Sequence, residues 1–436
     1  MNWEKEYRQK TMSADEAVAE FVQSGDVIYG SGATVACTAL NAVFRAIDKG
    51  TLSKLRLHIH TYTNPGLELD QYDFSRDQLD VSSHFWGPGE RALAAAGKCS
   101  YVPVQFGMHE SYMAFFHPTV SILMMSPPDS EGYCNIGPFG YIPAALEQSE
   151  RVIAQISRHV PRVNGTCHRI HVSRINAFIM ADEEMALLIN RPASPVEEAI
   201  AQNLLNYIPD GACIQLGIGS IANAVGFGLR DKHHLGIHTE VFTESMVDLM
   251  ECGAVDNSRK TTYPGKSVVG FMHGTKRQYD FVDGNMDMLF CRFSELVNIP
   301  NIAANDNMIS INGAVSVDLT GQVSAESIGP RQYSGTGGQL DFVRGAALSK
   351  GGASFIAIPS TARTRSGVVS RIVPQLAPGS IVTTPRTDVQ YVATEYGVAR
   401  LQFCDVPERV RRLISISHPD YRDELTYAAR QSGLLY

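Results

Sequence analysis

The chain has 436 residues, 44% hydrophobic and 19% charged, with a net charge of −8. One hydrophobic core rarely serves more than ~250 residues, so this length predicts two domains. The acidic balance excludes nucleic acid as the expected partner, because phosphate binding needs a concentrated basic face, and no apolar run approaches the ~20 residues of a membrane-spanning helix.

Two stretches about 187 positions apart follow one plan, in which an acidic-capped helix and a strand lead into a glycine loop. The loop is Gly30-Ser31-Gly32 in the first stretch and Gly217-Ile218-Gly219 in the second, and an apolar helical segment follows each. This repeat predicts an α/β fold of two related open α/β domains with mostly parallel sheets. Pro192 and Pro195 interrupt regular structure, so we expect domains at 1–190 and 191–436.

Other segments complete the expected alternation of strands and helices. Further strands are expected at 55–60, 121–125, 268–272, 308–312, 355–358 and 380–384, and further helices at 199–207, 245–252, 343–349, 407–414 and 419–431. Ligands of parallel sheets sit at the carboxyl ends of the strands, where both glycine loops lie.

The second glycine loop follows a strand and enters a helix, so its N–H groups can face a phosphate or an oxyanion. The same loop also fits a dinucleotide fingerprint, with Glu240 in the place of the acidic residue that binds ribose. A structural tight turn is the third reading of this segment. The loop alone leaves all three open.

In the stretch 236–244 a short strand brings Glu240 to its end, before the helix expected from Ser245, and a strand end is a rigid position for a reactive carboxylate. The plainer interpretation is that Glu240 or Glu244 favours the start of the following helix, where acidic residues suit the helix dipole. Glu326 and Glu395 are rival carboxylates.

A second glycine-rich segment, 334–338, precedes the helix that ends at Lys350. Its three glycines allow close approach of the backbone to a ligand. Lys350 can serve as a cation for that ligand, or only as a cation at a helix C-terminus. Arg363, Arg365 and Arg371 could bind anions, although solvated surface arginines are commoner.

The eight cysteines are scattered without a Cys-x-x-Cys pair, which indicates reduced thiols in the cytoplasm. The N-terminus is charged from the start and lacks the apolar stretch of a secretory signal. No cluster of histidines and cysteines has the spacing of a metal-binding motif along the sequence, so we expect no metal.

Several motifs together resemble the acetyl-CoA hydrolase/transferase family, and most of all its 4-hydroxybutyrate and butyrate:acetate CoA-transferases. These motifs span nearly the whole chain in order: 126–129, 215–219, 238–240, 312–323, 334–342, 394–397 and 418–422. The resemblance implies that Glu240 is the catalytic nucleophile and that the N–H groups of Ile218 and Gly338 form the oxyanion site. It further implies CoA contacts at Gln215, Leu216, Gly217, Ile218, Gly219, Asn312, Gly338 and Lys350.

The resemblance implies a ping-pong transfer of CoA from an acyl-CoA, such as acetyl-CoA, to a short-chain carboxylate such as 4-hydroxybutyrate or butyrate. Glu240 would pass through an acyl-anhydride and a glutamyl-CoA thioester. A low pKa is expected for Glu240, because it must be ionised to attack. CoA would be a substrate and no cofactor would stay bound, and symmetric homo-oligomers are common among soluble enzymes. The alternatives are an acetyl-CoA hydrolase with the same glutamate, then an NAD-dependent oxidoreductase, then a non-catalytic CoA-binding protein.

Overall fold

The computed structural model describes residues 2–61, 63–189, 191–365 and 367–436. The chain divides into two compact units. The first comprises residues 1–188 and 270–294, and the second residues 189–269 and 295–436. The sequence analysis placed one division near residue 190 and had no signal for the return of 270–294 to the first unit.

The first unit is built on a seven-stranded sheet in which every pair of neighbours is parallel. In spatial order its strands are β4 (Cys99–Tyr101), β3 (Leu79–Ser83), β2 (Leu55–His58), β1 (Val27–Tyr29), β5 (Val120–Met125), β7 (Arg151–Ile156) and β9 (Ala177–Met180). All six residues of β5 are buried, as a central parallel strand requires. The strand order reverses between β1 and β5, and ligands of open α/β sheets bind at such points.

The helices of the first unit pack around that sheet and complete its core. They are α1 (Trp3–Lys10), α2 (Ala14–Phe21), α3 (Cys37–Asp48), α4 (Pro88–Ala95), α5 (His109–Phe116), α6 (Ile142–Gln148) and α10 (Lys276–Val282). Leu40, Val43 and Phe44 on α3 are fully buried, and they belong to one apolar cluster with residues of β1 and β2.

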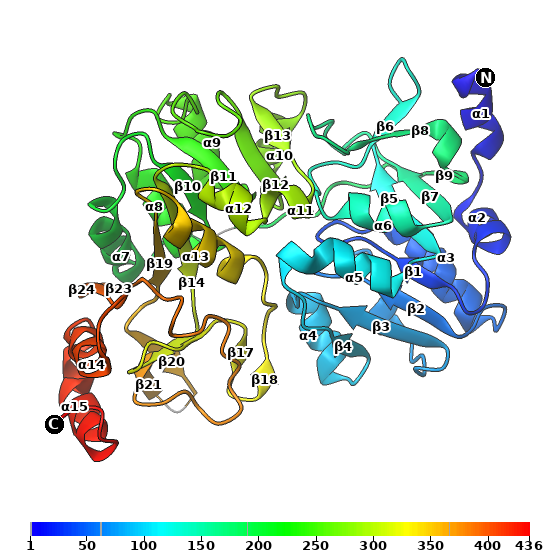
Figure 1. Ribbon diagram of the computed structural model, residues 1–436. Helices are drawn as coiled ribbons and strands as arrows, with labels where there is room; N and C mark the ends of the chain where they lie inside the picture. The colour runs from blue at the N-terminus through cyan, green and yellow to red at the C-terminus, as the bar shows by residue number, and fades with distance from the viewer. Residues whose placement is uncertain (1, 62, 190, 366) are drawn as a thin grey trace. The chain divides into compact units, whose positions relative to one another are not determined.

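An eight-stranded sheet repeats the plan (Figure 1). Its strands lie in the second unit, except that residues 270–271 and 288–290 belong to the 270–294 segment of the first. In spatial order its strands are β13 (Met288–Phe290), β12 (Ser267–Phe271), β11 (Gly236–Val241), β10 (Cys213–Leu216), β14 (Met308–Gly313), β19 (Ala353–Ala357), β23 (Tyr391–Thr394) and β24 (Gly397–Arg400). β10 is parallel to both β11 and β14, so the order reverses there as it does at β1. The predicted α/β class with mostly parallel sheets is confirmed.

The helices around the second sheet are α7 (Pro195–Leu205), α8 (Ser220–Gly228), α9 (Glu244–Glu251), α11 (Phe293–Leu296), α12 (Ile299–Ala303), α13 (Gln339–Leu348), α14 (Val406–Ser415) and α15 (Arg422–Gln431). α13 lies against β14 and β19 (Figure 1). The helices that open the two repeats, α2 and α7, begin with the same capping box, from Ser13 and Ser194 respectively. None of the helices within the described ranges is long and apolar enough to cross a bilayer.

Short strands lie outside the two main sheets. They are β6 (Tyr133–Asn135), β8 (Arg169–His171), β15 (Ser316–Asp318), β16 (Val323–Ser324), β17 (Ser327–Ile328), β18 (Arg331–Gln332), β20 (Thr361–Thr364), β21 (Gly367–Ser370) and β22 (Ile372–Val373). The strand expected at 380–384 is wrong: only Thr384 forms an isolated bridge, with Val323. Ile381 and Val382 in that segment are 45% and 40% exposed, so their apolar character does not reflect burial.

Candidate active site

Glu240 lies near the carboxyl end of β11, and the start of α13 meets it there. The backbone N–H of Gly338 donates a 2.7 Å hydrogen bond to Oε2 of Glu240. Gly338 caps the N-terminus of α13, so its N–H belongs to the helix end whose dipole favours negative charge. The structure therefore brings together two residues 98 positions apart that the sequence analysis had assigned to one reaction centre.

Only glycine fits at position 338 in this arrangement. A Cβ there would lie 2.2 Å from Oε2 of Glu240 and 2.9 Å from Cγ1 of Val297. The backbone angle of Gly338, φ −99°, is one that any residue can adopt, so contact rather than conformation imposes the requirement.

The low pKa expected for Glu240 is not what the structure shows. Burial raises the pKa of Glu240 to about 8, against the lowering effect of the Gly338 hydrogen bond, and the negative charge of Asp341 adds to the rise. One N–H donor does not outweigh the loss of hydration. Asp341 is buried in the first turn of α13, and no local pattern predicts its effect on a second carboxylate.

The Gly217 loop connects β10 to α8 at the same edge of the sheet. Gly219 has φ +124°, a conformation that essentially only glycine adopts, and it precedes the first residue of α8. The N–H of Gly217 donates to the carbonyl of Ile311 on β14 (2.9 Å), while Ile218 is half exposed. The loop thus presents Ile218 outward over a helix N-terminus.

Gln215 and Asn312 hold two neighbouring strand ends together. Nε2 of Gln215 donates to Oδ1 of Asn312 (3.0 Å), and Nδ2 of Asn312 donates to Oε1 of Gln215 (3.1 Å). Ser310 donates to the same Oε1 at 2.6 Å, a contact that the sequence analysis did not anticipate. Gln215 is 2% exposed and Leu216 is fully buried, so their side chains support the loop from beneath.

A cavity of about 190 Å³ opens beside this loop. Its walls include Glu197, Ile218, Gly219, Ser220, Asn312 and Arg371. The Arg371 guanidinium is held in place because it donates to the carbonyls of Ala314 and Val315. Hydrogen bonds from Arg191, Ser194 and Ser220 lower the pKa of Glu197 to about 2, although burial acts in the opposite direction. The cavity therefore carries one fixed cation and one fixed anion beside the N-terminus of α8.

The rival carboxylates are occupied elsewhere in the second unit. Glu326 accepts hydrogen bonds from Thr336 and Thr383, which anchors the 334–338 loop. Glu395 accepts from the N–H and the hydroxyl of Ser360. Both carboxylates therefore stabilise local structure through these hydrogen bonds. Glu240 remains the candidate for the reactive carboxylate.

Lys350 lies apart from the other predicted site residues. It follows the C-terminal end of α13, a helix of ten residues that separates it from Gly338 by roughly 15 Å. Its carbonyl accepts from the N–H of Asn307, before β14 begins, whereas Asn312 lies near the end of that strand. Its exposed ammonium group faces Asp306 at 3.7 Å. Arg363 and Arg365 are also exposed, outside the cavity.

The variant Gly338→Ala is expected to lower kcat/KM for CoA transfer by roughly 10²-fold, because the new methyl group displaces the Glu240 carboxylate by about an ångström. Steady-state kinetics of CoA exchange measure this effect. Gly66→Ala is the matched control, since its Cβ would meet only Cys37 at 3.7 Å. Equal values of kcat/KM for the two variants would contradict the close contact between position 338 and the Glu240 carboxylate.

Known proteins resemble this chain over nearly its whole length. The acetyl-CoA hydrolase/transferase N-terminal domain matches residues 1–190, and the C-terminal domain of the same family matches residues 274–429. The chain is 41% identical to succinyl-CoA:cyclohexane-1-carboxylate CoA transferase of Geobacter metallireducens, over 99% of this chain and 97% of that protein. It is 39% identical to 4-hydroxybutyrate coenzyme A transferase of Clostridium kluyveri, over 98% of each.

Solved structures give the same result. The crystal structure of RipA from Yersinia pestis superposes with a TM-score of 0.94 at 34% identity, covering all of both chains. The matched length covers residues of both units. The chain belongs to the acetyl-CoA hydrolase/transferase family.

Proposed function

We propose that the protein is a CoA-transferase in which Glu240 is the covalent nucleophile. The observation that carries the proposal is the hydrogen bond from Gly338 N–H to Oε2 of Glu240. A carboxylate whose one oxygen is fixed by a helix N-terminus has its second oxygen, Oε1, in a defined direction for attack. The substrates we propose are acetyl-CoA and a short-chain carboxylate such as 4-hydroxybutyrate or butyrate.

In the first step Oε1 attacks the thioester carbonyl, the C–S bond breaks, and CoA leaves as a thiolate. The product is a mixed anhydride between Glu240 and the acyl group. The thiolate then attacks Cδ of Glu240, and the acyl group leaves as a carboxylate. Glu240 is now a thioester of CoA, and an incoming acid reverses the two steps.

Gly338 suits the steps that occur at Cδ. When a thiolate or carboxylate attacks Cδ, the negative charge develops on the oxygen that is not in the anhydride or thioester bond. That oxygen is Oε2, which already accepts the Gly338 N–H at 2.7 Å. One donor of this kind contributes ~3 kcal/mol to stabilisation of a tetrahedral intermediate. We assign Ile218 N–H to the corresponding role on the acyl oxygen.

CoA is proposed to lie along the Gly217–Gly219 loop, with part of it in the cavity beside Arg371 and Asn312. In this assignment Gln215 positions Asn312 and the loop, and a contact of CoA with Lys350 stays a prediction. CoA acts as a substrate, and we propose that the protein works in the cytoplasm as a homo-oligomer. The NAD alternative loses support because Glu240, its ribose-binding candidate, is engaged by Gly338.

The test is to incubate the protein with acetyl-CoA without an acceptor acid, digest it at mildly acid pH, and search for a CoA-modified peptide by mass spectrometry. We expect CoA on Glu240 in the wild type and in the control Glu244→Gln, and no adduct in Glu240→Ala. Absence of any adduct, together with absence of CoA exchange into butyrate or cyclohexane-1-carboxylate, would sink the proposal. Release of free CoA without acceptor at the rate of exchange would indicate a hydrolase instead.

A further inference from the structure

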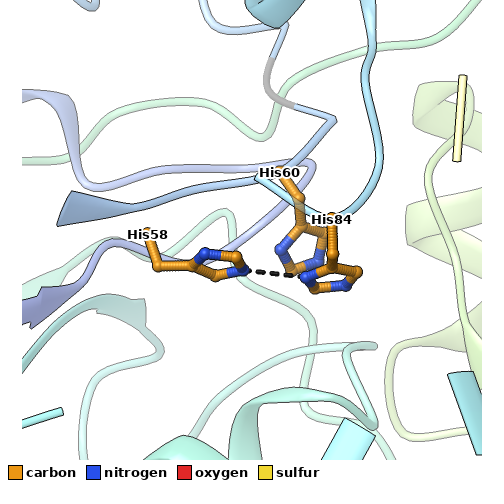
Figure 2. A group of neighbouring side chains, drawn as sticks. All are labelled: His58, His60 and His84. Atoms are coloured by element: carbon orange, nitrogen blue, oxygen red, sulfur yellow. Dashed lines mark hydrogen bonds between the residues drawn. The ribbon is translucent and has the colours of Figure 1, made fainter. Parts of the chain in front are cut away.

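Three histidines gather at the carboxyl edge of the first unit's sheet. His58 is the last residue of β2, His60 follows two positions later, and His84 directly follows β3. β2 and β3 are parallel neighbours with His58 opposite Ser82, which brings the three side chains to one place. Figure 2 shows the rings of His60 and His84 against one another, with the ring of His58 reaching them from its own strand.

The ring nitrogens of these residues converge. Each histidine offers one nitrogen that lies within 4.8 Å of those of the other two. Nε2 of His58 lies 2.8 Å from Nδ1 of His84, and the ring centroids of His60 and His84 are 4.4 Å apart. Two imidazole nitrogens bound to one tetrahedral ion at about 2.0 Å are separated by roughly 3.3 Å. An ion bound here would replace the hydrogen bond between His58 and His84 and would move these two nitrogens apart by about 0.5 Å.

The cluster holds unpartnered polar atoms in a closed interior. His58 and His84 are fully buried and His60 is 3% exposed. Among the described residues, both ring nitrogens of His60 and Nε2 of His84 have no hydrogen-bond partner. Buried nitrogens of this kind are costly and uncommon in folded proteins, so the cluster requires a ligand or another explanation.

The surroundings match those of a metal-binding histidine. Nδ1 of His58 faces the hydroxyls of Ser82 (3.1 Å) and Tyr112 (3.2 Å). A proton on this Nδ1 is donated to a hydroxyl, which leaves the Nε2 lone pair directed into the cluster. Partners of this type orient ligating imidazoles in metal sites.

The first glycine loop makes room for this group. A Cβ on Gly32 would lie 2.5 Å from Nε2 of His60 and 2.6 Å from the hydroxyl of Tyr141. In the repeat, Gly30 and Gly32 correspond to Gly217 and Gly219, and β2 corresponds to β11 because each is the parallel neighbour of the strand before its loop. The strand that corresponds to β11 thus ends at His58 in the first unit, and His60 follows two positions later.

We propose that His58, His60 and His84 form a binding site for a divalent first-row transition-metal ion of the Zn²⁺ type. Three neutral imidazoles without a carboxylate suit Zn²⁺ or Co²⁺ and not the oxygen-seeking Ca²⁺ or Mg²⁺. His109 borders the group, with its ring centroid 5.2 Å from that of His84 and its Nδ1 unpartnered among the described residues. Spacing along the sequence did not predict this metal site, because His84 follows a different strand from His58 and His60.

The test uses the full chain without an affinity tag, stripped with EDTA and titrated with Co²⁺, whose visible absorption reports coordination by nitrogen. Metal content is then measured by mass spectrometry after gel filtration with Zn²⁺. We expect one equivalent per chain, displacement of Co²⁺ by Zn²⁺, and metal–nitrogen distances of about 2.0 Å by X-ray absorption. His60→Asn and His84→Gln should bind roughly 100-fold more weakly or not at all.

His168→Gln is the matched control, because His168 is equally buried and unpartnered among the described residues but stands outside the cluster. It should retain the full equivalent. If the cluster variants misfold, Tyr112→Phe tests the site instead. Loss of the Tyr112 hydroxyl, which contacts His58, should weaken metal binding about tenfold and leave the fold intact. The proposal would be overturned if the wild type retained no metal, which is the result expected if only water fills the cluster. Full metal binding by His60→Asn would also overturn it. Neither outcome depends on CoA transfer.

Discussion

Replacing Glu240 with glutamine is expected to lower the rate of CoA exchange between acetyl-CoA and butyrate by roughly 10⁴-fold. The amide keeps the shape of the side chain and can still accept from Gly338 N–H, but it cannot form the anhydride. Steady-state kinetics with both substrates measure the loss. Binding of acetyl-CoA, followed by calorimetry, should change little, because the variant removes the nucleophile and not the CoA site.

Two further variants distinguish loss of the nucleophile from general damage. Glu240→Asp keeps a carboxylate but withdraws it by about an ångström, so we expect a loss of roughly 10²-fold. Glu244→Gln changes a carboxylate four positions away, in the first turn of α9, and should be close to wild type. A Glu240→Gln enzyme with more than a tenth of wild-type exchange would exclude Glu240 as the nucleophile.

The raised pKa of Glu240 predicts that the first half-reaction depends steeply on pH. Because burial raises this pKa to about 8 and only the ionised carboxylate attacks, kcat/KM for acetyl-CoA should rise about tenfold per pH unit below pH 8 and then level. Rapid-mixing measurement of CoA release between pH 5.5 and 9 tests this. Asp341→Asn should move the midpoint downward, since the charge of Asp341 contributes to the rise.

The same pKa has a consequence for stability, with a defined sign. The unfolded chain ionises Glu240 near pH 4.5, whereas the folded chain keeps the proton until about pH 8. The folded state therefore binds more protons in this interval and loses stability as the pH rises through it. Glu240→Gln should raise Tm relative to wild type at pH 8 but not at pH 4. A flat rate profile together with equal Tm values would show that the carboxylate is ionised in the free enzyme.

The fold was largely readable from sequence because local patterns and tertiary burial agree. The repeated plan of capped helix, strand and glycine loop predicted β1 and β10 and the helices that follow them. The exception at 380–384 has the apolar pattern of a strand, but no neighbouring strand pairs with more than Thr384. Strand propensity without a partner does not make a sheet.

The site was only partly predictable. The strand ending at Glu240 and the glycines near 338 could be identified, but their hydrogen bond joins segments 98 residues apart. The pKa of Glu240 depends on Asp341 and on burial, which no local pattern encodes. The three histidines had one local sign, His58-x-His60 on a strand, and the third member could be found only from the pairing of β2 with β3.

The return of residues 270–294 to the first unit determines the order in which the chain can fold during synthesis. Tyr279 in this segment donates from its hydroxyl to the carbonyl of Ala186 (2.8 Å), and the N–H of Gly140 donates to the carbonyl of Gly270. The ribosome must therefore translate some eighty residues of the second unit before the first unit has all of its parts. A fragment that stops near residue 190 would lack the hydrogen bonds that Ala186 and Gly140 make with this segment. We expect such a fragment to fold poorly on its own.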